Sequence, residues 1–163
     1  MKGRKGPLRV SDVLQREFPD IDPGATEVCI NLLRAEGLVA GGLSSYLRRY
    51  DLTIAMFNVL MILRGAEGAP LCPHEIGDRL LVTRGTVTGL LDSLEHRGLV
   101  ERAQHPEDRR MVSVSITERA LALLEDLLPG HWANERDMLA GLSDREKNSL
   151  VRLLGKVQGS LSG

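Results

Sequence analysis

The sequence predicts a mainly α-helical (α+β) fold in which a single β-hairpin interrupts a series of amphipathic helices. Apolar residues recur at steps of three and four over most of the chain, as on the buried face of a helix. Thr or Ser stands directly before several of these segments, where an N-cap is expected. Only residues 99–117 follow the period of two that is typical of strands. With 163 residues, of which 42% are apolar, the chain can bury a core of its own.

Residues 1–24 are expected to form a flexible, basic N-terminal arm. They carry four Lys or Arg residues up to position 9 and lack the apolar run of a signal peptide. Residues 25–52 follow as the first long helix, since apolar positions recur from Val28 to Leu47 in steps of three and four. The glycines that indicate a bend or close packing in this helix are Gly37, Gly41 and Gly42.

The lobe predicted over residues 53–117 begins with a helix that Thr53 caps and that ends near Gly65. One broad face of this helix is apolar and is expected to be buried. That face consists of Met56, Phe57, Leu60, Met61 and Leu63.

Two further helices are predicted on either side of a very short turn. Residues 72–75 have the pattern of a helix start, with Pro at the first helical position and Glu at the third. After a turn at residues 82–83, Thr83 caps the second helix, which Gly98 ends. Two helices joined in this way form a helix-turn-helix. The residues that the first of them is expected to bury are Ile76, Leu80 and Leu81.

Two strands follow, over residues 99–104 and 112–116, and the polar residues 105–110 join them as a hairpin. Val112, Val114 and Ile116 are expected on the apolar face of the second strand. A hairpin directly after a helix-turn-helix is the order of a winged helix-turn-helix, in which the second helix enters the major groove of DNA and the hairpin is the wing.

Residues 118–163 are predicted to form two C-terminal helices. Thr117 caps the first, in which Pro129 is expected to cause a kink, and Ser143 with Glu146 forms a capping box for the second. Together with the first long helix they leave more apolar helical surface than one small lobe can bury, which favours association between chains.

The second helix of the helix-turn-helix is the candidate recognition helix. The candidate DNA-binding residues lie on its outward side and on the wing. Small hydroxyl residues and glycines allow close approach to DNA, and an arginine can contact a guanine or a phosphate. Arginine on a wing suits the narrow minor groove, and an aspartate can hold it in place. The recognition-helix set is Thr83, Arg84, Gly85, Thr86, Thr88 and Gly89, and the wing set is Asp108, Arg109 and Arg110.

The charge balance argues against nonspecific coating of nucleic acid. The chain has a net charge of −1, and residues 71–116 carry six arginines against seven acidic residues. Affinity for DNA would therefore depend on a few well-placed arginines and not on bulk charge.

The residues of this region resemble the MarR family of bacterial transcription regulators. The resemblance extends over residues 25–157 and is most specific over the recognition helix and the wing. It rests on residues 52–53, 80–88 (LLVTRGTVT), 94–102 (LEHRGLVER), 108–110 (DRR), 115–117 (SIT) and 141–143 (GLS).

The resemblance implies an obligate homodimer, built from the first helix (residues 25–52) and the last two (residues 118–163), that binds a pseudo-palindromic operator in double-stranded DNA. It implies that Asp108 and Arg110 form the wing motif, with the arginine in the minor groove. Members are often repressors that a small anionic or aromatic ligand releases from DNA, bound between the dimer region and the DNA-binding lobe. Tyr46, Arg49 and Trp132 are conceivable pocket residues, although ordinary packing explains each of them.

Two alternative functions remain open at this stage. A winged helix can bind a protein partner in place of DNA, and Cys29 or Cys72 could make the chain a thiol-based redox sensor. Cys72 is at a helix N-terminus, which lowers a thiol pKa and favours the reactive thiolate.

We predict no cofactor, no metal site and no catalytic site, because the sequence contains no matching motif. With two cysteines and no membrane-spanning segment, the chain is expected to be cytoplasmic.

Overall fold

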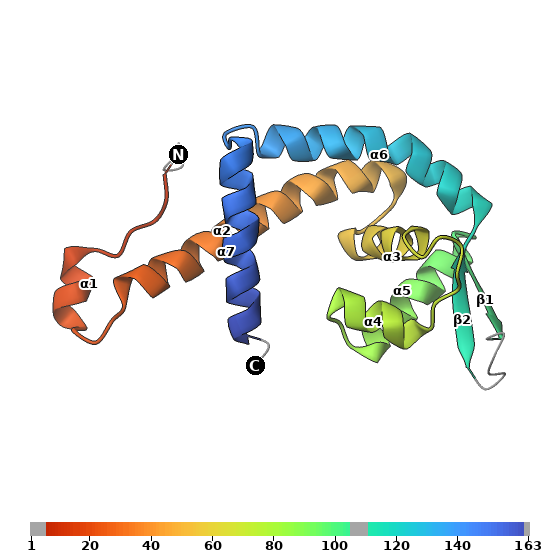
Figure 1. Cartoon of the computed structure of the whole chain (residues 1–163), viewed down its shortest axis with the longest axis horizontal. Helices are drawn as coiled ribbons and strands as arrows, with labels where there is room; N and C mark the ends of the chain where they lie inside the picture. Colours follow the sequence, from red (N-terminus) through yellow and green to blue (C-terminus); the bar gives the residue numbers. More distant parts are fainter. Residues whose placement is uncertain (1–5, 105–110, 162–163) are drawn as a thin grey trace. The chain divides into compact units, whose positions relative to one another are not determined.

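The computed structural model describes residues 6–104 and 111–161. In this part of the chain, seven α-helices, one 3-10 helix and a two-stranded sheet follow one another in the order α1, α2, η1, α3, α4, α5, β1, β2, α6 and α7 (Figure 1). The mainly helical α+β class is therefore confirmed. The chain divides into two compact units, Met1–Gly42 and Leu43–Gly163.

The described part of the first unit contains a short helix within the segment expected from the sequence to be a flexible arm. Residues Asp12–Glu17 form the short helix α1, whose N-cap Ser11 accepts a hydrogen bond from the N–H of Leu14. Helix α2 (Pro23–Leu47) begins two residues earlier than predicted, because Asp22 accepts a hydrogen bond from the N–H of Ala25. Helix α2 runs on without interruption through its glycines into the first residues of the second unit.

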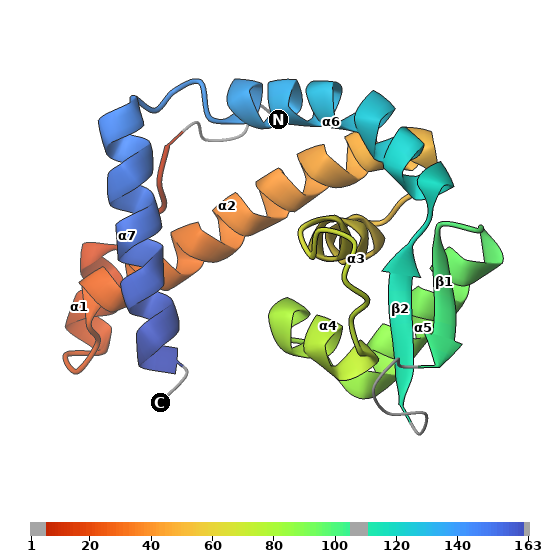
Figure 2. The same ribbon diagram turned by 45° about the vertical axis from the view of Figure 1, so that its right-hand side comes forward.

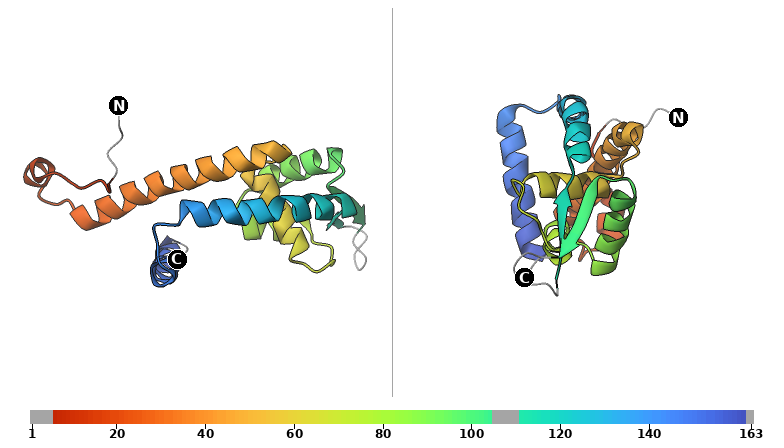
Figure 3. Two further views of the ribbon diagram at one scale, coloured as in Figure 1. Left: turned by 90° about the horizontal axis from the view of Figure 1, so that it is seen from above. Right: turned by 90° about the vertical axis from the view of Figure 1, so that its right-hand side faces the viewer.

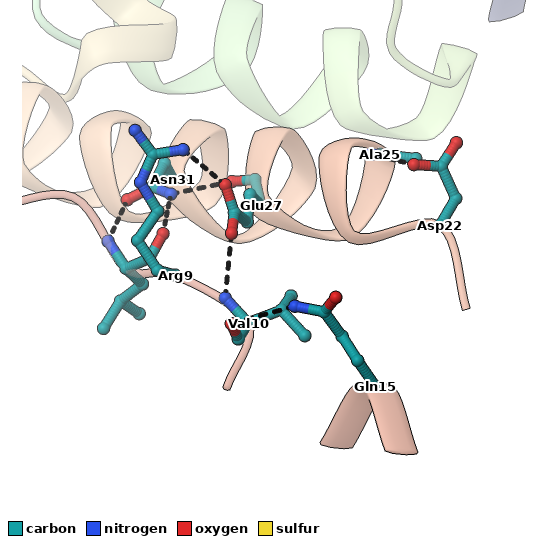
Figure 4. Close-up of polar contacts among 8 residues, drawn as sticks. Arg9, Val10, Gln15, Asp22, Ala25, Glu27 and Asn31 are labelled. Atoms are coloured by element: carbon teal, nitrogen blue, oxygen red, sulfur yellow. Dashed lines mark hydrogen bonds and ion pairs between the residues drawn. The ribbon is translucent and has the colours of Figure 1, made fainter. Parts of the chain in front are cut away.

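The N-terminal segment is fastened to α2 by side chains of the helix (Figure 4). The Asn31 amide pairs with both backbone groups of Leu8, accepting from its N–H at 2.8 Å and donating to its carbonyl at 2.9 Å. Glu27 accepts the N–H of Val10 at 2.9 Å and forms an ion pair with Arg9. These contacts lower the pKa of Glu27, chiefly through the Val10 hydrogen bond and then through Arg9. The described residues before α1 are therefore bonded to α2, while the flexibility expected of residues 1–24 stays a prediction.

The second unit has one apolar core around α3 (Ile54–Arg64). Thr53 caps α3 as predicted, accepting from the N–H of Met56 at 3.1 Å, and the 3-10 helix η1 (Arg48–Tyr50) precedes it. Of the five residues predicted to be buried, all but Met61 are, and Met61 is half-buried at the edge of the core. Helices α4 (Pro73–Leu80) and α5 (Arg84–His96) pack beside α3 (Figure 2).

The turn between α4 and α5 is tighter than helical periodicity predicts. Leu81, expected to be buried, is 92% exposed, because it is the C-cap of α4 with a left-handed φ of 55° and points away from the helix face. The two helices contact each other at the buried Gly77. Here a Cβ atom would lie 3.1 Å from Cγ2 of Val87.

Strands β1 (Val100–Gln104) and β2 (Val112–Ile116) pair antiparallel, with Val100 opposite Ile116. Leu71 adds a one-residue bridge on the other side of β2, through two hydrogen bonds with Val114. The predicted alternation on β2 is wrong at its start: Val112 is exposed, whereas Ser113 is buried. Val112 is exposed because it lies at the end of β2 nearer the wing, outside the apolar core in which Val114 is buried.

Helices α6 (Glu118–Met138) and α7 (Asp144–Leu161) close the second unit, and the chain turns sharply between them (Figure 3). Thr117 and the Ser143–Glu146 capping box begin these helices as predicted. Pro129 lies inside α6 without ending it. Helix α7 contributes no buried residue, and Leu150, Val151, Leu153 and Leu161 are exposed on it.

Within the described ranges, no helix combines the length and the apolarity that crossing a bilayer requires.

Candidate nucleic-acid interface

The outward side of α5 is open to solvent along its first two turns. Its inner side is fixed, because Val87, Leu91 and Leu94 are buried in the core. All six residues predicted to contact DNA are exposed: Thr83, Arg84, Gly85, Thr86, Thr88 and Gly89. The amphipathic pattern of the helix thus leaves this set free for a partner.

Hydroxyl groups at the start of α5 already have bonds within the helix. Thr83 caps it by accepting from the N–H of Thr86 at 3.3 Å, and the two hydroxyl oxygens lie 3.0 Å apart. The Thr88 hydroxyl donates to the Arg84 carbonyl at 3.0 Å. Each of these oxygens retains a lone pair, so the threonines present acceptors and methyl groups outward.

Arginines near α5 divide into two kinds. Arg102 bridges Asp92 and Glu95 at 2.7 and 2.6 Å, and Arg97 donates to two backbone carbonyls, so both act within the fold. Arg84, by contrast, is exposed and has no hydrogen-bond or ion-pair partner among the residues that the structure describes. A solvated guanidinium at a helix N-terminus suits a phosphate or a guanine edge.

The wing set Asp108, Arg109 and Arg110 lies outside the described residues. The strands that carry it are described, and they place the hairpin beside α5 through the Arg102 bridge and the hydrogen bond from Arg102 to the Thr88 carbonyl. The assignment of these three residues to DNA stays a prediction.

A cavity of about 330 Å³ opens between the start of α4, the outward side of α5 and the beginning of β2. Arg84 and Thr88, both predicted to contact DNA, line it together with residues that the sequence analysis did not connect to them. Those additional lining residues are Cys72, Pro73, His74, Val87, Met111 and Val112. Sequence periodicity gives no signal for this cavity, because the bridge between Leu71 and Val114 brings the three segments together.

The two cysteines have opposite environments. Cys72 is 3% exposed, and burial, followed by the nearby Glu75 carboxylate, raises the pKa of its thiol. The predicted lowering of this pKa is therefore wrong, since loss of solvation and a like charge outweigh the helix N-terminus. Cys29 is exposed on α2.

None of the conceivable pocket residues Tyr46, Arg49 and Trp132 lines the cavity beside α5. Tyr46 donates its hydroxyl to the Leu127 carbonyl at 2.7 Å and stacks obliquely on Tyr50. The Arg49 guanidinium lies 5.5 Å from the Tyr46 ring centre, and Trp132 is 53% exposed on α6. Sequence analysis also missed the buried His131, whose ring lies 4.4 Å from that of Phe57.

Comparisons with known proteins agree with this geometry. A model described as the MarR family matches residues 50–111. The transcriptional repressor YetL of Bacillus subtilis is 34% identical over 145 residues, which cover 89% of this chain and 87% of that protein. The transcriptional regulator PecS of Dickeya dadantii is 35% identical over 159 residues, covering 94% and 95%.

Solved structures give the same assignment. A mutant MarR from E. coli complexed with operator DNA is similar, with a TM-score of 0.73 and 29% identity over 90% of this chain and 99% of that one. BpsR of Bordetella bronchiseptica, whose DNA binding is regulated by 6-hydroxynicotinic acid, has a TM-score of 0.73 and 27% identity over 80% and 92%. The chain belongs to the MarR family of winged-helix, DNA-binding transcriptional regulators.

Proposed function

We propose that this chain is a cytoplasmic repressor that binds a pseudo-palindromic operator as a homodimer. In this function α5 lies in the major groove, where Arg84 contacts a guanine or a phosphate, and Arg110 of the wing enters the minor groove. The chain acts by binding and release and needs no cofactor.

The observation that carries the proposal is the contrast between Arg84 and the neighbouring arginines. Arg97 and Arg102 are held by bonds within the fold, whereas Arg84 is exposed on the side of α5 that the core leaves open. In a chain with a net charge of −1, one such arginine per protomer contributes more when two protomers bind together.

Each of the two units has exposed apolar residues that support the proposed homodimer. In the first unit α2 exposes Leu33 by 71% and Leu38 by 76%, and in the second unit α7 exposes Val151 by 70%. Apolar helical surface of this kind is typical of an interface between copies of a chain. It extends over residues 25–52 and 118–163, the segments predicted to dimerise.

A small anionic aromatic ligand would have a binding place in the cavity beside α5. Its volume is at the lower end of the range for ligand sites, and Arg84 supplies a cation. A ligand there would occupy Arg84 and Thr88 and so compete with DNA for them. The BpsR comparison makes 6-hydroxynicotinic acid a suitable first probe.

The operator is tested by selecting duplexes from a random-sequence pool with the full chain. We expect a duplex with two inverted half-sites, bound by two chains as determined by native mass spectrometry. Arg110→Ala should weaken binding at least about tenfold, as expected for the loss of one groove contact in each protomer. Arg119→Ala, which removes an exposed arginine from the base of α6, is the matched control and should bind as the wild type does. Equal binding by Arg110→Ala and the wild type would reject the wing assignment.

Ligand release is tested on the same duplex with 6-hydroxynicotinate. Addition of the compound should weaken binding by the wild type, and Val112→Trp, which fills the cavity, should abolish that response. Release that persists in Val112→Trp would place the ligand elsewhere and contradict the cavity as its site.

A further inference from the structure

Residues 95–98 comprise the final two residues of α5, its C-cap Arg97 and Gly98, and they are bonded to the ends of two other helices. The Arg97 guanidinium donates to the carbonyl of Asp51 at 2.6 Å and to that of Tyr50 at 3.0 Å. Both carbonyls are at the end of η1, directly after α2. Residues 95–98 and residues 50–51 are thus joined by one side chain across 46 positions of sequence.

These two carbonyls are a suitable site for a cation. The final carbonyls of a helix have no partner within it and carry the negative end of its dipole. Asp51 has a left-handed φ of 55°, with its N–H bonded back to the Arg48 carbonyl, which ends η1 there. Arg97 therefore caps the end of η1 from a different element, with two bonds that fix the orientation of its planar fork.

The same residues are bonded to the start of α6. The Thr117 hydroxyl donates to the Gly98 carbonyl at 2.8 Å while its oxygen accepts from the N–H of Ala120, so one residue caps α6 and holds the end of α5. Gly98 has a φ of 65°, which lets the chain turn directly from α5 into β1. The ends of η1, α5 and α6 consequently meet at residues 95–98.

We propose that Arg97 is a positioning residue for DNA recognition, which sets the orientation of α5 by tying its last turn to the end of η1, with Thr117 as the second tie. The inference rests on the proposed function, because η1 and the start of α6 lie within residues 25–52 and 118–163, the segments assigned to the dimer. In a dimer, the orientation of α5 in each protomer decides the spacing between the two recognition helices, and hence the half-site spacing that is bound. Arg97 itself need not touch DNA.

The orientation of α5 can be measured without DNA, by the distance between spin labels in the dimer. The label is placed at Thr86→Cys in a Cys29→Ser background, since Cys72 is buried and is left in place. We expect a narrow distance distribution in this parent protein and a broad one after Arg97→Gln. Arg97→Lys keeps the charge but replaces the planar fork with a single ammonium nitrogen, and it should give an intermediate width. Arg119→Gln removes a charge beside Gly98 without removing a hydrogen bond or ion pair to any residue that the structure describes, and it should leave the distribution narrow.

Binding to the selected duplex supplies the second measurement, with unlabelled protein. Arg97→Gln should bind the selected spacing about tenfold more weakly, and should lose most of the preference over a duplex with one extra base pair between the half-sites. Equal weakening at both spacings, or a lower melting temperature with an unchanged distance distribution, would mean that Arg97 only stabilises the fold and would overturn the proposal. If Arg97→Gln does not fold, Arg97→Lys gives the same comparison.

The two proposals fail in different ways. If the wild-type chain selects no duplex, the proposed operator binding is contradicted. If Arg97→Gln still broadens the distribution of label distances in that case, the role of Arg97 in orienting α5 remains supported. If the labelled parent protein gives no measurable distance between spin labels on two protomers, it is not a dimer. That result would overturn both the proposed function and the role of Arg97.

Discussion

Gly77 of α4 and Val87 of α5 pack against each other in the helix-turn-helix, where a Cβ on Gly77 would lie 3.1 Å from Val87 Cγ2. Both residues are buried, and the Val82 carbonyl lies 3.5 Å from the same point. A Cβ at position 77 fits only if the Val87 side chain gives way by a few tenths of an ångström, so we expect this contact to help set the position of α5.

Gly77→Ala is expected to destabilise the chain by about 1 kcal/mol, because overpacking outweighs the gain in helix propensity. Gly89→Ala is the matched control, since nothing lies within 4 Å of its Cβ position, and it should stabilise the chain by about 0.5–1 kcal/mol. Urea unfolding of both variants measures the difference. A stabilising Gly77→Ala would show that Val87 can move aside.

The attachment of the N-terminal segment to α2 should weaken at acidic pH, because Glu27 titrates whereas the Asn31–Leu8 hydrogen bonds do not. The pKa of Glu27 is lowered in the folded chain, so its contribution is present above the ordinary value of 4.5 and is lost as the pH falls through the lowered pKa. Limited proteolysis should release the segment at low pH in the wild type and already at neutral pH in Glu27→Gln. The exposed Glu36→Gln should behave as the wild type, and equal cleavage in all three would exclude Glu27 as the attachment.

The two thiols should react at very different rates. Cys29 is exposed, whereas Cys72 is buried with a raised pKa, so a thiol reagent at neutral pH should modify Cys29 rapidly and Cys72 only after unfolding. Mass mapping of briefly treated protein gives the order. Rapid modification of Cys72 in the folded chain would restore it as a candidate redox sensor, and Cys29 stays a prediction until oxidation is shown to alter DNA binding.

Tyr46→Phe should destabilise the second unit by about 1 kcal/mol, because it removes the hydroxyl that donates to the Leu127 carbonyl at 2.7 Å. Tyr50→Phe should cost less, since the Tyr50 and Tyr46 oxygens are 3.5 Å apart. Thermal unfolding compares the two variants. A larger loss of stability in Tyr50→Phe than in Tyr46→Phe would show that the Tyr46–Leu127 hydrogen bond contributes little to the packing of α6.

Local signals predicted most of the elements correctly. Thr53, Thr83, Thr117 and Ser143 each cap the helix expected of them, because capping depends on residues three positions apart. The helix-turn-helix and the hairpin follow from hydrophobic period and turn residues, which also act over short distances.

The remaining features depend on contacts between distant segments. Sequence could not show that Asn31 would hold Leu8, that Leu71 would extend the sheet at Val114, or that Arg97 would reach Tyr50. The outward side of α5 is exposed, as its hydrophobic period predicts. The cavity beside it, and the distinction between Arg84 and the internally bonded arginines, required the tertiary structure.

The central claim is that the exposed side of α5 binds DNA through Arg84. It is tested most directly by the salt dependence of binding to the selected duplex, measured for the wild type, Arg84→Ala and Arg119→Ala. We predict a steep fall in affinity with salt for the wild type, and for Arg84→Ala a slope lower by about one to two counterions per dimer. Arg119→Ala should keep the wild-type slope. Wild-type binding that does not depend on salt, or an unchanged slope and affinity in Arg84→Ala, would contradict the claim and favour a winged helix that docks a protein.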